Sequence, residues 1–228
     1  MDMVVRPRWN RGQSLDLQKN GWVTWDSGER DATAIELIID QCGHALGKSV
    51  STRPQRFVEA LTPRKQNQAR LRSLSGIHGL SELPLHADGS HWATPCRYVV
   101  LGCVCEDAIG TDTLLLDTAS MSLSITEKTI ALCAPFLVRS GRNSFYSCIL
   151  SNDRNFIRID PCCMEPLSSE SFEALRIFCY SRNISNVQRI SWKVGMIAVI
   201  DNWRVLHGRE SVSSTNSRRR LLRAMVMQ

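Results

Sequence analysis

The stretch MIAVIDNWRVLHGR, residues 196–209, carries the pattern that decides the fold. Its first six residues are mostly apolar up to Asp201, and a second apolar run ends at His207. Short apolar and β-branched runs of this kind, divided by turn-forming residues, are typical of β-strands. Many strands with few helices predict a mainly β fold, either a sandwich or a closed barrel. Short apolar and β-branched runs recur from about residue 83 onward, in residues 97–104, 113–118, 136–140, 144–150, 155–160 and 219–226.

Other segments predict helices and a loop around these strands. Residues 32–47 place apolar side chains at helical spacing and end on a glycine, which predicts an amphipathic helix. Residues 168–180 begin with SSESFEAL, and the acidic first turn favours a second helix. Residues 63–73 are polar and basic, so we expect a surface loop there.

Size and composition favour one globular domain. The chain has 228 residues, of which 43% are hydrophobic and 22% charged, ordinary values for a globular protein. No window resembles a membrane helix, and the first residues lack the apolar stretch of a secretory signal. We expect a single cytoplasmic domain over residues 1–228, with helical or strand elements in 1–49 and the β core in 83–228.

The nine cysteines are expected to be reduced. Their number is odd, no pair has C-x-x-C spacing, and most lie in apolar runs such as VVLGCVC. Free cysteine behaves as a small buried hydrophobe, so this distribution favours core positions over disulfides or zinc ligands.

The net charge of +6 is not arranged as a nucleic-acid interface. Four arginines crowd the segment 218–223, and others are scattered through residues 53–72, but aromatic residues are not interleaved with them. This pattern favours a solvated basic face, and we expect neither nucleic acid nor a membrane as a partner.

The candidate metal ligands lie in two segments. In LPLHAD, residues 83–88, alternation along a strand would point His86 and Asp88 to the same side. His207 ends the run described above. Two histidines and one carboxylate suit iron(II), since they leave positions open for oxygen and a chelating cosubstrate. An H-x-D pair alone is a weak signal, because short histidine–acid pairs are common.

The residues after His207 strengthen this interpretation. Arg219 and Arg223 lie in the strand-like run RRLLRAMV, where their even spacing places both on one face and Arg220 on the other. Arg223 lies between Leu222 and Ala224, so a solvated strand edge does not account for it. A guanidinium offers paired donors to a carboxylate, and we therefore expect an anionic partner.

These segments together resemble the taurine dioxygenase and clavaminate synthase-like family of Fe(II)- and 2-oxoglutarate-dependent oxygenases. The resemblance covers roughly residues 50–228. It rests on four strings in the family's order, namely LPLHADGSHWATPCRYVVL, TDTLLLD, IDNWRVLHGR and RRLLR. It implies a double-stranded β-helix, or jelly roll, with flanking helices. The interval from Asp88 to His207 looks shorter than usual for the family, so we expect an abbreviated lid.

The resemblance also implies residue roles. His86, Asp88 and His207 match the iron ligands, and Thr113 matches a threonine whose hydroxyl meets the 2-oxoglutarate cosubstrate. Arg223 matches the arginine that grips the distal carboxylate of 2-oxoglutarate, and Arg219 the one nearer its chelating end. The implied reaction consumes O2, releases succinate and CO2, and oxidises a small amino-acid-like or carboxylate substrate. With Asp88 present, hydroxylation is favoured over halogenation, whereas desaturation and cyclisation stay open.

Four further residues are expected to line the substrate pocket. His91 and Trp92 closely follow the H-x-D pair, Ser75 precedes it, and Arg209 follows His207. Trp92 is equally consistent with barrel packing, and Arg209 with an ion pair to Asp201. The sequence does not indicate an oligomeric state.

The sequence leaves three other readings to weigh. A cupin-like binding protein without turnover would have a damaged triad, and this triad is intact. A nucleic-acid demethylase of the same fold would show an arginine–asparagine signature that SRRRLLR lacks. A zinc hydrolase could use the same three ligands, but it would not require Thr113, Arg219 and Arg223.

Overall fold

The computed structural model describes residues 9–50, 57–71, 73–106, 110–150, 155–180, 186–213 and 217–228. The α-helices are α1 (Arg11–Asn20), α2 (Ala32–Leu46), α3 (Leu74–His78), α4 (Ile125–Cys133) and α5 (Ser169–Cys179). Single 3₁₀ turns are Gln66–Gln68, Thr118–Ser120 and Gly141–Asn143. The strands are β1 (Trp22–Asp26), β2 (Lys48–Val50), β3 (Val58–Leu61), β4 (Leu83–His86), β5 (Tyr98–Cys105), β6 (Thr113–Asp117), β7 (Phe136–Val138), β8 (Phe145–Ser147), β9 (Met164–Pro166), β10 (Gln188–Ile190), β11 (Met196–Asp201), β12 (Val205–Arg209) and β13 (Arg220–Met227).

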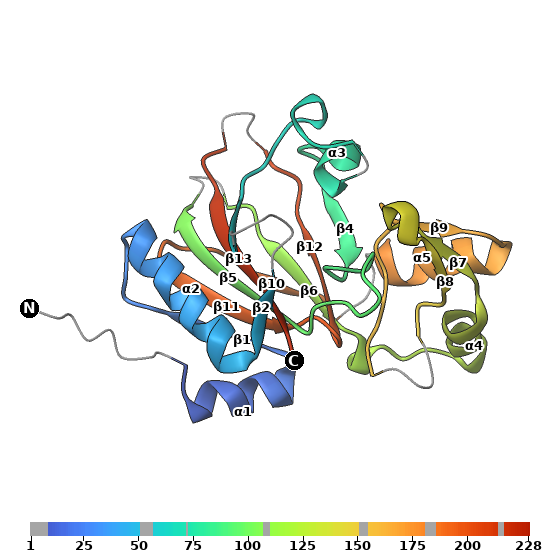
Figure 1. Ribbon diagram of the computed structural model, residues 1–228, viewed down its shortest axis with the longest axis horizontal. Coiled ribbons are helices and arrows are strands. Elements are labelled where there is room, and N and C mark those ends of the chain that lie inside the picture. Colours follow the sequence, from blue (N-terminus) through green and yellow to red (C-terminus); the bar gives the residue numbers. More distant parts are fainter. Residues whose placement is uncertain are drawn as a thin grey trace, which may run out of the picture.

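Two antiparallel sheets form the centre of the molecule. The larger has the order β1-β11-β5-β13-β2, with β3 also paired to β13, and the smaller has the order β10-β6-β12-β4. A third small sheet, β8-β7-β9, lies beside α4 and α5 at the far side of the molecule (Figure 1). The predicted jelly-roll class, mainly β with flanking helices, is confirmed.

Three apolar clusters show how these layers stack. Side chains of α2 such as Ile35 and Ile38 pack on the outer face of the larger sheet, which α2 crosses in Figure 1. A second cluster, which includes Leu101, Leu115 and Met225, fills the space between the two sheets. A third lies between the outer face of the smaller sheet and the unit of α4, α5 and β7–β9. The interior between the two sheets is therefore the side on which functional side chains must point.

Strand alternation decides which residues reach that interior. In β13, Leu221 and Met225 belong to the interior cluster, while Leu222 and Ala224 face α2. Arg223, between Leu222 and Ala224, therefore points inward, as the sequence predicted.

Several expectations about elements are confirmed and others are corrected. Helices at 32–47 and 168–180 are present as α2 and α5, and the predicted loop at 63–73 contains only a 3₁₀ turn among its described residues. The strand expected at 155–160 is wrong. That segment is irregular, because its backbone hydrogen bonds go to three separate places: Ala87, Ile149 and Trp203.

The β core begins earlier in the chain than expected. Strand β1 pairs with β11, and β2 and β3 both pair with β13, so the larger sheet takes strands from before residue 83. All nine cysteines are free. Core positions are confirmed for Cys42, Cys96, Cys103 and Cys179, whereas Cys133 is exposed and the other four are half-buried. Among the described residues, no helix has the length and apolar character needed to cross a membrane.

Candidate metal centre

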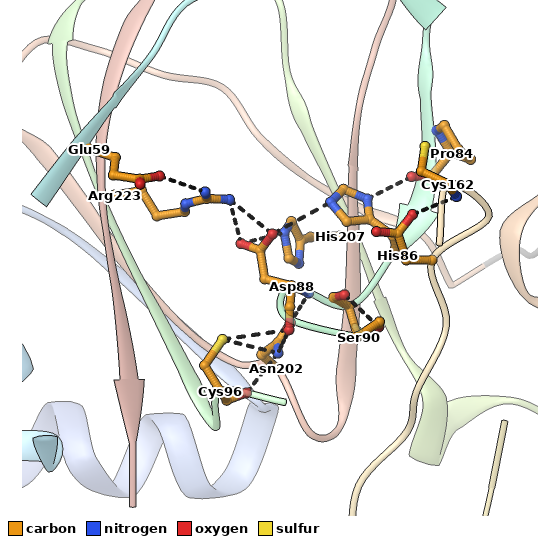
Figure 2. Close-up of polar contacts among 12 residues, drawn as sticks. Glu59, Pro84, His86, Asp88, Ser90, Cys96, Cys162, Asn202, His207 and Arg223 are labelled. Carbon is orange, nitrogen blue, oxygen red and sulfur yellow. Dashed lines mark hydrogen bonds and ion pairs between the residues drawn. The ribbon is translucent and has the colours of Figure 1, made fainter. Parts of the chain in front are cut away.

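The pairing of β4 with β12 brings two histidines together. His86 and His207 are direct cross-strand partners in the smaller sheet, and their ring centroids lie 4.5 Å apart. Asp88 follows β4 by two residues, and its carboxylate oxygens lie 3.9 Å from His86 Nε2 and 3.5 Å from His207 Nε2. One potential ligand atom from each residue lies within 4.8 Å of the other two. Figure 2 shows the three side chains converging on one point.

Local hydrogen bonding sets the tautomer of His86. Its Nδ1 lies 2.9 Å from the carbonyl oxygen of Pro84, to which it donates, and this leaves the Nε2 lone pair toward Asp88 and His207. Burial, reinforced by the neighbouring His207, lowers the pKa of His86 and keeps the imidazole neutral. A neutral imidazole with an unshared Nε2 is the form that binds a metal ion.

Asp88 is held as a carboxylate by its neighbours. Burial alone would raise its pKa, but the Arg223 guanidinium and then His207 outweigh burial and hold the pKa well below its usual range. Nη1 of Arg223 lies 2.9 Å from both carboxylate oxygens of Asp88. The second nitrogen of the same guanidinium lies 3.0 Å from Glu59, the partner of Arg223 across β3 and β13. The row Glu59–Arg223–Asp88 is visible in Figure 2.

The backbone of Asp88 is fixed by Asn202, a fully buried residue at the turn between β11 and β12. Its side-chain oxygen accepts from the Asp88 N–H at 2.8 Å. Its Nδ2 donates to the carbonyls of Asp88 at 3.0 Å and Cys96 at 2.7 Å. The Asn202 amide therefore makes three hydrogen bonds that fix the backbone at Asp88 and so the position of its carboxylate (Figure 2).

A second polar group lies further along the interior, around Thr113. Thr113 is the β6 partner of Arg209, two positions from the partner of His207, which is a separation of about 7 Å along the strand. Its hydroxyl accepts hydrogen bonds from Arg219 Nη2 at 3.0 Å and from Trp192 Nε1 at 2.9 Å. The side chains of Thr113 and Arg219 are both buried.

The two arginines therefore occupy the opposite order from the one expected. Arg223 contacts Asp88, a candidate metal ligand, and Arg219 contacts Thr113. The inward spacing of two arginines was predicted from alternation, but alternation does not say which end of the strand lies nearer the metal ligands. The direction in which β13 runs past His86 and His207 depends on tertiary pairing.

Two of the residues expected to line a substrate pocket, Arg209 and Ser75, lie at or near α3. Arg209 is buried and donates to the carbonyls of Gly79 and Ser81 at 2.8 and 2.6 Å, so it anchors the turn after α3. Its expected alternative partner Asp201 instead has Arg97 as an ion-pair partner, at 3.9 Å. Ser75 lies in α3 and is half-buried, with its carbonyl accepting from Gly79.

His91 and Trp92 lie on the loop directly after Asp88, half-buried and in edge contact, with ring centroids 5.5 Å apart. A fully buried arginine, Arg158, holds this loop by donating to the carbonyls of Ser90, Trp92 and Ala93. The sequence did not single out Arg158, because it lies in a segment that had the texture of a strand.

The donor set fits a first-row transition metal. Two imidazole nitrogens and a carboxylate meet at one point, all from buried residues, and the carboxylate is ionised. This is the ligand composition of non-haem iron(II) centres, in which the remaining coordination positions stay open. His207 Nδ1 is buried and has no hydrogen-bond partner among the described residues, so its ring orientation is set by packing and by its Nε2 contact.

Comparisons with known proteins point the same way. Residues 128–225 match the family model described as taurine catabolism dioxygenase TauD, TfdA family. The matched residues include His207, Arg219 and Arg223. The matched segment covers the C-terminal part of the chain, from within α4 to within β13. No curated protein matches the chain.

Solved structures share the fold of this chain. An asparagine oxygenase in complex with Fe(II), 3-hydroxyasparagine and succinate aligns with a TM-score of 0.72 and 17% identity, over 95% of this chain and 77% of that one. The non-heme iron oxygenase OrfP with Fe and alpha-ketoglutaric acid aligns with a TM-score of 0.72 and 17% identity, over 95% and 78%. OrfP with Fe, succinate and (3S)-hydroxy-L-Arg aligns with a TM-score of 0.71 and 15% identity, over 95% and 79%. These likenesses show the fold of the chain, and they agree with the predicted family and dioxygenase class.

Proposed function

We propose that this protein is an Fe(II)- and 2-oxoglutarate-dependent dioxygenase that hydroxylates a small amino-acid-like or carboxylate substrate in the cytoplasm. The observation that carries the proposal is the convergence of His86, Asp88 and His207 beside inward-facing arginines from the opposite sheet. A zinc hydrolase or a simple metal-binding protein requires the three ligands but not the arginines.

In this proposal the metal ligands bind the iron, and the arginines bind 2-oxoglutarate. His86, Asp88 and His207 would hold the iron, which supplies oxygen activation coupled to the conversion of 2-oxoglutarate to succinate and CO2. Arg219 and Thr113 would bind the carboxylate of 2-oxoglutarate that is remote from the metal, since they lie about 7 Å along the sheet from His207. Arg223, beside Asp88, would neutralise charge at the keto-acid end.

The substrate class follows from the fold relatives and from the site. The asparagine oxygenase and OrfP were solved with hydroxylated amino acids bound. We propose a free amino acid or a close derivative for this chain as well. The loop that carries His91 and Trp92 lies next to Asp88 and would line the substrate side.

The test is a substrate screen. Iron-loaded protein is incubated with 2-oxoglutarate and O2, and succinate is measured with and without each of the common amino acids and small carboxylates. We expect at least one compound to stimulate succinate release, and Asp88→Ala to abolish the stimulation. Hydrolysis of an ester or amide without succinate release would instead support the hydrolase. Metal binding without any turnover would support the binding protein.

A further inference from the structure

The Thr113 hydroxyl has both of its acceptor positions filled. Arg219 Nη2 and Trp192 Nε1 lie 3.0 and 2.9 Å from Thr113 Oγ1, and both groups can only donate. A hydroxyl has two lone pairs and one hydrogen, so the Thr113 hydrogen must point away from both neighbours. Within the part of the chain that the structure describes, no side chain or backbone atom accepts it.

From this geometry we infer that Trp192 is a positioning residue, which turns the Thr113 hydroxyl into a donor aimed at the remote carboxylate of 2-oxoglutarate. The inference rests on the proposed function and extends it to a residue that does not itself contact the cosubstrate. With Arg219 alone, the hydroxyl could still rotate between donating and accepting. A second fixed donor removes that freedom before the ligand arrives.

The local structure explains why Trp192 can do this. Ile190, the last residue of β10, is the cross-strand partner of Thr113, so Trp192 lies just beyond that pairing. Both Trp192 and Thr113 are buried, with 8% and 4% of their surfaces exposed, so water competes little for the indole N–H. A buried indole N–H needs an acceptor, and the Thr113 hydroxyl supplies it.

The surrounding charge favours an anion as the acceptor. Arg219 bonds Thr113 directly, and Arg209 is the β12 partner of Thr113. Burial, together with repulsion from Arg219, lowers the pKa of Arg209 to about 10, so it still carries its charge at neutral pH. Arg209 donates to the backbone carbonyls of Gly79, Ser81 and Glu210. Because carbonyl groups are neutral, these contacts do not compensate the positive charge of Arg209.

The experiment is anaerobic calorimetry of 2-oxoglutarate binding to the Fe(II)-loaded protein. Trp192→Phe keeps an aromatic ring but removes the indole N–H together with the volume of the five-membered ring, and we expect it to weaken 2-oxoglutarate binding on the order of three- to tenfold. Binding of 2-oxobutyrate, which lacks the remote carboxylate, should not change. In a Thr113→Val background, Trp192→Phe should have no further effect, because the hydroxyl that it orients is gone.

Trp203→Phe is the matched control. It also removes one indole hydrogen bond, here 3.0 Å to the carbonyl of Pro95, and we expect no selective loss of 2-oxoglutarate. If Trp192→Phe weakened both ligands equally, its role would be structural and the inference would be overturned. If 2-oxoglutarate binding were unchanged in Trp192→Phe but weakened in Thr113→Val, the inference about Trp192 would be overturned while the proposed cosubstrate site would stand. Unchanged binding in Thr113→Val as well would overturn the proposed cosubstrate site.

A second measurement does not depend on the folding of Trp192→Phe. Selective ¹⁵N labelling of the six tryptophans allows their indole N–H signals to be followed by NMR in protein loaded with diamagnetic Zn(II). The signal of Trp192 is identified as the one displaced by Thr113→Ser. We expect this signal to shift with 2-oxoglutarate and not with 2-oxobutyrate, and equal responses to both ligands would contradict the inference.

Discussion

Asp88 owes its place to side chains that are distant in sequence. Asn202, 114 positions away, makes three hydrogen bonds to the backbone of Asp88 and Cys96, and Arg223 neutralises the carboxylate. The sequence singled out His86, Asp88 and His207 as candidate ligands, together with Arg223, because their spacing along strands is recognisable. It did not identify Asn202, Glu59 or Trp192, because their contacts join residues that are distant in sequence and leave no periodic signal.

Asn202→Ala should weaken metal binding. The substitution frees the Asp88 backbone and leaves its buried N–H without an acceptor, so we expect a loss of metal affinity on the order of 10- to 100-fold. Isothermal titration with Co(II) measures this affinity. Asn186→Ala, which removes a surface amide bonded to the carbonyl of Ser120, is the control and should leave it unchanged. Equal affinities for both variants would show that Asn202 does not position the ligand.

Substitutions of Arg219 and Arg223 should have different effects on 2-oxoglutarate binding and on metal affinity. Arg219→Met should raise the half-saturating 2-oxoglutarate concentration by roughly 10- to 100-fold, the loss of one charge-assisted contact, without changing metal affinity. Arg223→Met should change metal affinity as well, because Asp88 loses its buried counter-charge. Steady-state kinetics combined with metal titration distinguishes them. The assignment fails if Arg219→Met alters metal affinity while Arg223→Met does not.

Acid should destabilise the metal-free protein through His86. Its pKa is lowered in the folded chain, mainly by burial, whereas in the unfolded chain it is about 6.5. The unfolded state then binds more protons near pH 6, so the free energy of unfolding falls as pH drops below about 6.5. His78 shifts in the same direction, and the measurement therefore uses a His78→Gln background. Urea unfolding from pH 5 to 7 should lose part of its pH slope when His86→Gln is added. An unchanged slope would contradict the shift.

At the scale of elements, periodicity succeeded where one face is buried. Helix α2 is amphipathic, with Ile35, Ile38 and Ile39 buried against the larger sheet, and its pattern was readable. Helix α1 buries only Leu17 and α4 only Ala131, so neither has a pattern strong enough to predict. The strand predicted at residues 155–160 is wrong because a buried segment can have an apolar sequence without being a strand. Ile157, Arg158 and Ile159 are all buried although the segment is irregular.

The N-cap of α2 offers a test at this scale. The Asp31 side chain accepts from the N–H groups of Thr33 and Ala34, both at 3.0 Å. Asp31→Ala should therefore lower the free energy of unfolding by about 1 kcal/mol, measured by urea denaturation. Metal affinity should stay unchanged, because α2 covers the outer face of the larger sheet. A change in metal affinity would show that α2 is coupled to the site.

At the scale of the whole molecule, the two sheets act as the two halves of one site. The smaller sheet supplies His86, His207 and Thr113, and the larger supplies Glu59 and Arg223. The strand-rich sequence predicted the fold class, and it predicted three candidate ligands that the structure brings together. It did not predict that β1, β2 and β3 complete the larger sheet, since their short runs resemble loops until they are paired. The register between sheets, and hence the order of the two arginines, depends on that pairing.

The most direct test of this account is an anaerobic titration of Fe(II) into the metal-free protein, with and without 2-oxoglutarate. We expect one iron per chain, bound more tightly when 2-oxoglutarate is present, and loss of this binding in His207→Ala. Iron binding that is unchanged in His207→Ala, or that is indifferent to 2-oxoglutarate, would contradict the account.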